Sequence, residues 1–256
     1  MDYSPIISQV FKLWWFIPII LLIALFKTPW FKGMLGEALV KLAAKLWLPT
    51  HTYQPIHNVT LQTVDGTTQI DHIFVSRYGV FVVETKHMQG WIFGSEKQAQ
   101  WTQKIYKQSF KFQNPLRQNY KHVKAVEQLL DLPEQWVHSV IVFSGDSTFK
   151  TTMPANVTQG IGYIHYIKSF QNPVLTEQEV IDVVARIQHG RLSPTRETHR
   201  EHVAHLNTRA DVNASRICPR CGNAMVLRTR KRGSNAGKQF WGCSTYPRCK
   251  AMQNID

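Results

Sequence analysis

The sequence predicts an α/β fold, a mixed sheet flanked by helices, with small elements added at both ends. Three observations indicate it. Strand-like and helix-like patterns follow one another in the order α-β-β-β-α-β-(β)-α. A strongly apolar segment precedes them, and a basic segment with all four cysteines follows. We therefore divide the chain into 1–30, 31–190, a polar linker 191–215 and 216–256.

The N-terminal segment is apolar from Ile6 to Phe26. A membrane-spanning helix needs roughly 20 such residues, so residues 1–30 are expected to form a single-pass transmembrane anchor in contact with lipid. Lys27, Lys32 and further lysines follow the segment, which places the rest of the chain in the cytoplasm by the positive-inside rule. The alternatives are a buried core helix and a re-entrant hairpin.

A helix is expected at Gly33–Leu48, where Pro49 ends the pattern. Its apolar positions recur at helical spacing and form one stripe. Glu37 lies off that stripe, so core packing alone does not explain it. The stripe consists of Leu35, Leu39, Leu42 and Leu46.

Four strands are expected next, because β-branched and aromatic residues are bounded by turn signals. A polar loop follows them, and a helix then begins at Asn114-Pro115 and runs to about Leu130. The strands are Asn58–Val64, Gln69–Val75, Val80–Lys86 and Gly90–Phe93.

Beyond that helix, Val137–Phe143 reads as a buried central strand and Ile161–Ile167 as a further short strand. A capping box at Thr176-Glu-Gln-Glu179 opens a helix that ends at Gly190. The elements complete a sheet with helices on both faces.

Two carboxylates face each other across the predicted hairpin. If its turn is centred between Arg77 and Tyr78, Asp71 lies opposite Glu84, and Lys86 shares the face of Glu84. Opposed carboxylates repel each other and destabilise a sheet. A Mg²⁺ or Mn²⁺ ion between them would explain the pair, and a polar sheet face with a carboxylate–lysine contact is the alternative.

This motif and its surroundings resemble a known family. Asp followed by Glu-x-Lys on adjoining strands is the pattern of the PD-(D/E)xK nuclease superfamily, and the landmarks resemble its NERD (nuclease-related domain) branch over roughly residues 33–145. The landmarks are Gly36-Glu37, Gln69-Ile70-Asp71-His72, Gly79–Lys86, Gly90, Trp101 and Asn114–Gln118.

The resemblance implies a restriction-endonuclease-like fold and metal-dependent hydrolysis of phosphodiester bonds. Asp71 and Glu84 would bind Mg²⁺ or Mn²⁺ together with the carbonyl of Thr85. Glu37 would be a third acidic ligand or a water-mediated one, and a helix-surface glutamate paired with Lys41 is the alternative. Lys86 would position the attacking water or neutralise the developing phosphorane. Gln118 would orient phosphate or water.

The C-terminal segment carries its cysteines in two pairs. Short pair spacing fits a metal site in a reducing compartment better than a disulfide framework. The segment resembles the C-terminal zinc ribbon of type IA topoisomerases, which binds single-stranded DNA. Zn²⁺ would be bound by Cys218, Cys221, Cys243 and Cys249.

The charge of the chain indicates an anionic partner, either nucleic acid or an acidic membrane surface. The formal net charge is +13 and the pI about 9.7. Cations and aromatic rings alternate in the ribbon, as expected if they contact phosphates and bases, although the rings also suit a small core. The expected partner is DNA, with RNA not distinguished from it. The candidate nucleic-acid-binding residues are Arg228, Arg230, Lys231, Arg232, Lys238, Phe240, Trp241 and Tyr246.

Two functions are therefore compatible with the sequence. One is a membrane-anchored, metal-dependent nuclease that hydrolyses DNA. The other is a catalytically inactive, membrane-tethered protein that binds DNA through its ribbon.

Overall fold

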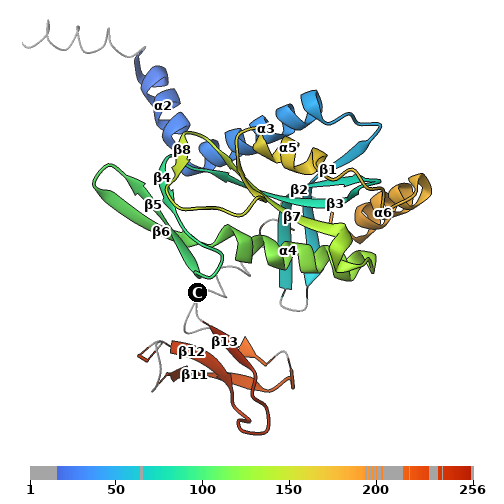
Figure 1. Ribbon diagram of the computed structural model, residues 1–256. Helices are drawn as coiled ribbons and strands as arrows, with labels where there is room; N and C mark the ends of the chain where they lie inside the picture. The colour runs from blue at the N-terminus through green and yellow to red at the C-terminus, as the bar shows by residue number, and fades with distance from the viewer. Residues whose placement is uncertain are drawn as a thin grey trace, which may run out of the picture.

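Two sheets with their covering helices form the larger part of the chain, and a small four-stranded sheet forms the C-terminal part (Figure 1). The computed structural model describes residues 16–63 and 66–193, the single positions 195, 198, 200 and 203, and residues 216–218, 220–230, 236–237 and 239–254. Residues 1–15 and most of the expected linker lie outside this set. The helices are α2 (Phe16–Lys27), α3 (Pro29–Trp47), α4 (Pro115–Leu130), the short 3₁₀ helix η1 (Glu134–Trp136), α5 (Gly162–Lys168) and α6 (Glu177–Gly190).

The main sheet is mixed, with strand order β1-β2-β3-β7-β9. The first three strands are antiparallel, β7 runs parallel to β3, and β9 runs parallel to β7. Helices α4 and α6 pack on one face and α3 and α5 on the other (Figure 1). A mixed α/β fold with helices on both faces is confirmed. The strands are β1 (Tyr53–Thr63), β2 (Gly66–Ser76), β3 (Gly79–His87), β7 (Val137–Ser144) and β9 (Val157–Gln159).

The central hairpin has the expected register. Val75 pairs with Val80, and Ile73 pairs with Val82, as a turn at residues 77 and 78 requires. Gly79 follows the turn with φ +130°, a conformation that side chains rarely adopt. The register brings Asp71 of β2 and Glu84 of β3 together, one residue beyond the last described pair, His72 and Val83.

The second sheet, of order β6-β5-β4-β8, shows that one sequence prediction was wrong. The stretch expected to be a polar loop is the hairpin of β5 and β6, in which Trp101 is fully buried. The polar side chains are compatible with strands because one face of this hairpin meets solvent. The strands are β4 (Gly90–Phe93), β5 (Gln100–Ile105), β6 (Gln108–Gln113) and β8 (Ser147–Phe149).

The expected strand at Ile161–Ile167 is instead helix α5. Tyr163, Ile164 and Ile167 are buried, and this i, i+1, i+4 spacing suits a helix face better than an alternating strand. The other late elements follow the prediction, and Thr176 and Glu179 form the expected capping box.

The orientation of α3 differs from the expectation that its leucine stripe faces the core. The face that packs on the sheet carries Gly36, Val40 and Ala44, one turn apart, and Leu48 follows just beyond the helix. Small side chains on this face let the helix approach the sheet closely, and the leucines point outward instead. They are 42–64% exposed.

The N-terminal anchor remains a prediction. Among the described residues, no single helix is both long and apolar enough to cross a bilayer. Helices α2 and α3 meet that requirement only as a pair bent by 67°. The first half of the expected span, Ile6–Trp15, lies outside the described residues.

The C-terminal sheet is antiparallel throughout, with strand order β10-β11-β12-β13. Its core contains Met225, Trp241 and three of the cysteines. Such a core is too small to hold a domain by apolar burial alone. The strands are β10 (Arg216–Ile217), β11 (Ala224–Thr229), β12 (Gln239–Cys243) and β13 (Met252–Asn254).

Candidate metal centres and nucleic-acid interface

Asp71 lies at the open end of the β2–β3 hairpin. One carboxylate oxygen, Oδ2, accepts a hydrogen bond from the backbone N–H of Thr85 at 2.8 Å. This contact replaces the next rung of the ladder, because the described pairing ends at His72 and Val83. The carboxylate is therefore held beside the Glu84–Lys86 segment, and the backbone of Thr85 lies next to it.

Glu84 is buried at the centre of a polar network. Its Oε1 accepts hydrogen bonds from Lys86 Nζ at 2.6 Å and from Gln118 Nε2 at 2.7 Å. Lys86 also donates to Gln118 Oε1 at 2.8 Å, so each of the three side chains contacts the other two. Lys86 and Gln118 therefore meet at one carboxylate oxygen, although they come from different elements.

The two carboxylates differ in charge. Burial and the charge of Glu84 raise the pKa of Asp71 to about 8, against the opposing effect of the Thr85 N–H. Burial would also raise the pKa of Glu84, but the contacts of His122 and Lys86 outweigh it and lower that pKa. In the absence of a bound metal ion, Glu84 is therefore the charged member of the pair, and Asp71 loses its proton only near pH 8.

Glu37 reaches this pair from α3. Its pKa is raised by burial and by the charge of Glu84, while Lys41 acts in the opposite direction. The preceding Gly36 explains the approach, since a Cβ there would lie 2.6 Å from Ser144 Oγ and 2.8 Å from His87 Cβ. The glycine lets α3 contact the ends of β3 and β7, which brings the third acidic residue within electrostatic range of the other two.

His122 is a site residue that sequence reasoning missed. Its Nε2 lies 3.2 Å from Glu84 Oε2, an ion-pair distance without the alignment of a hydrogen bond. Its Nδ1 lies 2.7 Å from Thr68 Oγ1 on β2. The available signal was its spacing, because a residue four positions after Gln118 lies on the same face of α4.

We expect His122→Ala to lower the free energy of unfolding by about 1–3 kcal/mol, since Glu84 then loses a buried partner. His122→Gln, which keeps a donor at this position, should recover part of the loss. Urea unfolding measured by circular dichroism tests both. Equal stability of the alanine variant and the wild type would show that the contact with Glu84 contributes nothing.

The four cysteines form the second centre. Their sulfur atoms all lie within 4.8 Å of one another, and the Sγ–Sγ distances are 3.7 Å for Cys218–Cys249 and 3.4 Å for Cys221–Cys243. Thiolates at about 2.3 Å from a tetrahedral zinc ion are separated by roughly 3.8 Å. The four cysteines, none of which is in a disulfide, therefore fit a zinc ribbon site.

The ribbon residues expected to bind nucleic acid differ in exposure. Trp241 is only 6% exposed and packs in the core, so its expected stacking on bases is not supported. Tyr246 is 59% exposed, and the guanidinium of Arg228 lies 5.5 Å from its ring centroid. Arg230 lies 5.2 Å from the ring of Phe240. Lys231, Arg232 and Lys238 lie outside the described residues.

Comparison with known families agrees with both parts of the chain. The Nuclease-related domain family matches residues 32–144, and the Topoisomerase DNA binding C4 zinc finger matches residues 215–256. The fold and the two centres thus define a nuclease-related domain joined to a zinc ribbon.

The chain belongs to the NERD family. A Bacillus anthracis protein, described only as uncharacterised, is 38% identical to it over 187 residues, which cover 71% of this chain and 86% of that protein.

Proposed function

We propose that this protein is a divalent-metal-dependent nuclease of the PD-(D/E)xK type that hydrolyses DNA phosphodiester bonds. The observation that carries the proposal is the convergence of Asp71, Glu84, Lys86 and Gln118 from three elements, where the pairing of β2 with β3 ends. Family membership supports the same reaction class, because the domain is nuclease-related.

The acidic cluster has the donor chemistry of a magnesium or manganese site. Carboxylate oxygens are hard ligands, and burial together with the charge of Glu84 raises the pKa of Asp71, an effect that a bound cation would offset. Asp71 and Glu84 would hold the ion, with the Thr85 carbonyl and Glu37 beside them. Because Oε1 of Glu84 is shared by Lys86 and Gln118, ion binding there would displace one of these partners.

The bound ion supplies an activated water and charge stabilisation of the leaving oxygen. Lys86 is the cation of this group, and its ammonium would hold the attacking water or a phosphate oxygen. Gln118 would orient Lys86 through its Oε1 and present its amide to the phosphate. Glu84 holds both side chains in the ion-free site, so the partner that ion binding does not displace is already ordered when substrate arrives.

The experiment is a cleavage screen with the full chain on linear, circular, nicked and single-stranded DNA, and on RNA. Cleavage of DNA with Mg²⁺ or Mn²⁺, and its loss in EDTA, is expected. An RNA-only activity would correct the substrate. Binding of DNA without cleavage of any substrate would favour the inactive, DNA-tethering protein. That alternative is compatible with the site, because Glu84 already has protein partners in Lys86, Gln118 and His122.

The zinc ribbon would add nucleic-acid affinity. Arg228 and Arg230 supply cations, and Tyr246 supplies an exposed ring, so phosphate contact and base stacking are combined on one small surface. The matched family is one of DNA-binding zinc fingers, which supports DNA as the ligand.

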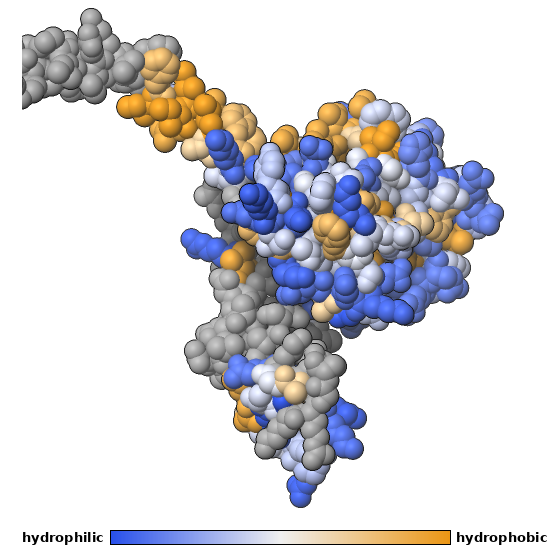
Figure 2. All heavy atoms as spheres, turned by 60° about the vertical axis from the view of Figure 1, so that its left-hand side comes forward, coloured by the Kyte–Doolittle hydropathy of each residue, from blue (hydrophilic) through white to orange (hydrophobic). Residues whose placement is uncertain are grey.

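We also propose that the N-terminus attaches the protein to the cell membrane as a single-pass anchor, with the remaining domains in the cytoplasm. Helix α2 supports it, since none of its residues is buried and its surface is hydrophobic (Figure 2). We expect the full-length protein to sediment with membranes and to resist alkaline carbonate, because charge screening does not release an apolar helix. Complete release into the supernatant would contradict the anchor.

A further inference from the structure

Helix α3 presents an apolar face to the outside of the domain. Leu35 and Leu39 are 42% and 47% exposed, and Leu42 and Leu46 are 54% and 64% exposed. These positions recur every three or four residues, so they form one stripe along the helix. Val40 and Ala44 on the opposite face are buried against the sheet, so the orientation of the helix is fixed and the stripe cannot turn inward.

The leucine stripe belongs to a larger hydrophobic surface. A hollow of about 310 Å³ beside it is lined by Leu39, Leu42, Leu46 and Trp47 of α3 and by Ile161 at the start of α5. At its N-terminal end, α3 continues from the exposed apolar helix α2, at an angle of 67° (Figures 1 and 2). An apolar patch that continues along two helices marks an interaction surface rather than ordinary surface variation.

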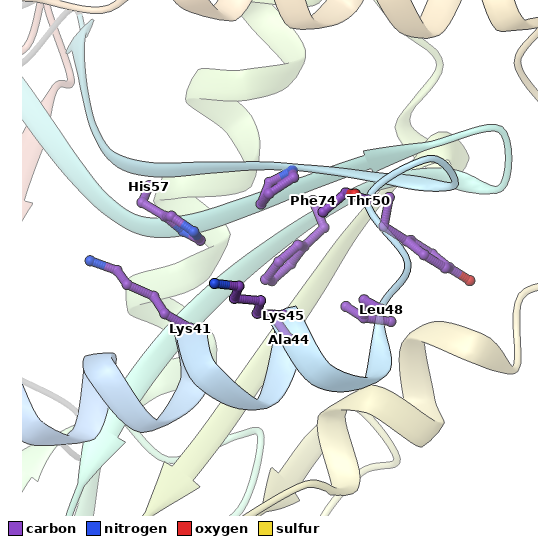
Figure 3. A pocket seen from close by; sticks show the side chains of 9 residues that line it. Lys41, Ala44, Lys45, Leu48, Thr50, His57 and Phe74 are labelled. Carbon is purple, nitrogen blue, oxygen red and sulfur yellow. The ribbon is translucent and has the colours of Figure 1, made fainter.

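The charges around the stripe are almost all positive. Residues 16–48 contain four lysines and a single carboxylate, Glu37, which belongs to the acidic cluster. Lys41 and Lys45 lie one turn apart along one edge of α3, where they border a hollow of about 280 Å³ with His57 and Phe74 (Figure 3). A leucine stripe edged by lysines has the composition of a helix that lies in the plane of an anionic lipid surface.

We propose that α3 is an in-plane membrane-docking helix. Its leucine stripe enters the boundary between headgroups and acyl chains, and the ammonium groups of Lys41 and Lys45 contact lipid phosphates at the edge. This goes beyond the proposed anchor, on which it rests, because it fixes the nuclease-like domain against the bilayer instead of leaving it tethered by one segment.

A second copy of the chain fits this face less well than lipid does. Two α3 helices packed stripe to stripe as an antiparallel pair would bring the lysine edges of both copies together, and the single carboxylate of the helix, Glu37, belongs to the acidic cluster. An anionic bilayer supplies the opposite charge along the whole edge. The continuity of α3 with the apolar helix α2 also favours lipid, since both helices would then contact the same bilayer.

The test is hydroxyl-radical footprinting of the full chain in phosphatidylcholine vesicles with and without phosphatidylglycerol, read by mass spectrometry. In anionic vesicles, oxidation of the Leu39–Leu46 peptide should fall about fivefold or more relative to the peptide containing Ile181, which is 60% exposed on α6. Protection should be weaker in the neutral vesicles. Leu42→Glu/Leu46→Glu should restore oxidation around the stripe, whereas Ile181→Glu should change nothing there.

Three outcomes would overturn the inference. If the stripe is oxidised as readily as Ile181 while α2 is protected, the anchor stands and in-plane docking is wrong. If α2 and the stripe are both oxidised, membrane attachment fails as well. If the stripe is protected equally in both vesicle types and cross-linking yields dimers, a second copy covers it.

Discussion

Asp71→Asn should reduce DNA cleavage by at least about a thousandfold, because it removes a charged oxygen ligand from the acidic cluster. The fold should survive. Asparagine has the same shape, and its side-chain oxygen can still accept the hydrogen bond from the Thr85 N–H. Cleavage with Mg²⁺ and Mn²⁺, followed on the best substrate of the screen, provides the measurement.

Stability supplies the control for this variant. The folded-state pKa of Asp71 is raised to about 8 from an ordinary value of 3.8, so the folded protein binds this proton more tightly than the unfolded chain. A group of this kind favours folding at low pH and loses that contribution as the pH rises from about 4 to about 8. In EDTA, Asp71→Asn should therefore be at least as stable as the wild type at pH 8, with a smaller difference at pH 5.

Glu84→Gln should abolish cleavage too, but unlike Asp71→Asn it should destabilise the fold. Glu84 is the common partner of Lys86, Gln118 and His122, so its neutralisation leaves buried donors poorly compensated. Removing one member of a buried ion pair costs about 3–5 kcal/mol. Undiminished cleavage by either variant would show that the carboxylates take no part in the mechanism. Equal stability of Asp71→Asn and Glu84→Gln would contradict the network described around Glu84.

Removal of zinc should unfold the ribbon and leave the larger domain folded. The ribbon core consists mainly of cysteine side chains with Met225 and Trp241, so the metal–thiolate bonds provide the folding free energy that apolar burial cannot. Chelation, or Cys243→Ser, should collapse the amide NMR signals of residues 216–256. Signals from the main sheet should persist.

Loss of the ribbon should weaken nucleic-acid binding more than catalysis on short substrates. Phosphate contacts by residues such as Arg228 make the affinity fall steeply with salt, and this slope should flatten after chelation. An isolated ribbon that purifies without zinc, or DNA affinity unchanged in Cys243→Ser, would exclude the role assigned to it. Arg228→Ala distinguishes the loss of a phosphate contact from unfolding of the ribbon, since it should reduce DNA affinity while zinc remains bound.

The sequence was most informative where local patterns determine structure. The hairpin register followed from the positions of Val75, Val80 and Gly79, and the contact between Glu84 and Lys86 followed from strand alternation. The cysteine cluster followed from residue type and context. In each case a short stretch of chain holds the relevant information.

Features that depend on distant parts of the chain were missed. Which face of α3 is buried depends on how closely Gly36 approaches Ser144, more than a hundred residues away, and hydrophobicity alone selected the wrong face. His122 joins the site through Thr68 and Glu84 on separate strands, a contact that no local pattern contains. For Trp241 the sequence left stacking and core packing open, and the structure places it in the core.

The close approach at Gly36 has a consequence for the order in which the site is assembled during synthesis. The β2–β3 hairpin, with Asp71 and Glu84, can form as soon as it leaves the ribosome. Helix α3 precedes it, yet the position of Glu37 depends on the close approach of the neighbouring Gly36 to His87 and Ser144 at the ends of β3 and β7. A nascent chain that ends before residue 144 therefore has β3, on which most of α3 packs, but lacks the contact of Gly36 with Ser144. The contact with β7 is thus made after that with β3, so the position of Glu37 beside Asp71 and Glu84 is fully fixed only after the residues of the hairpin have been synthesised.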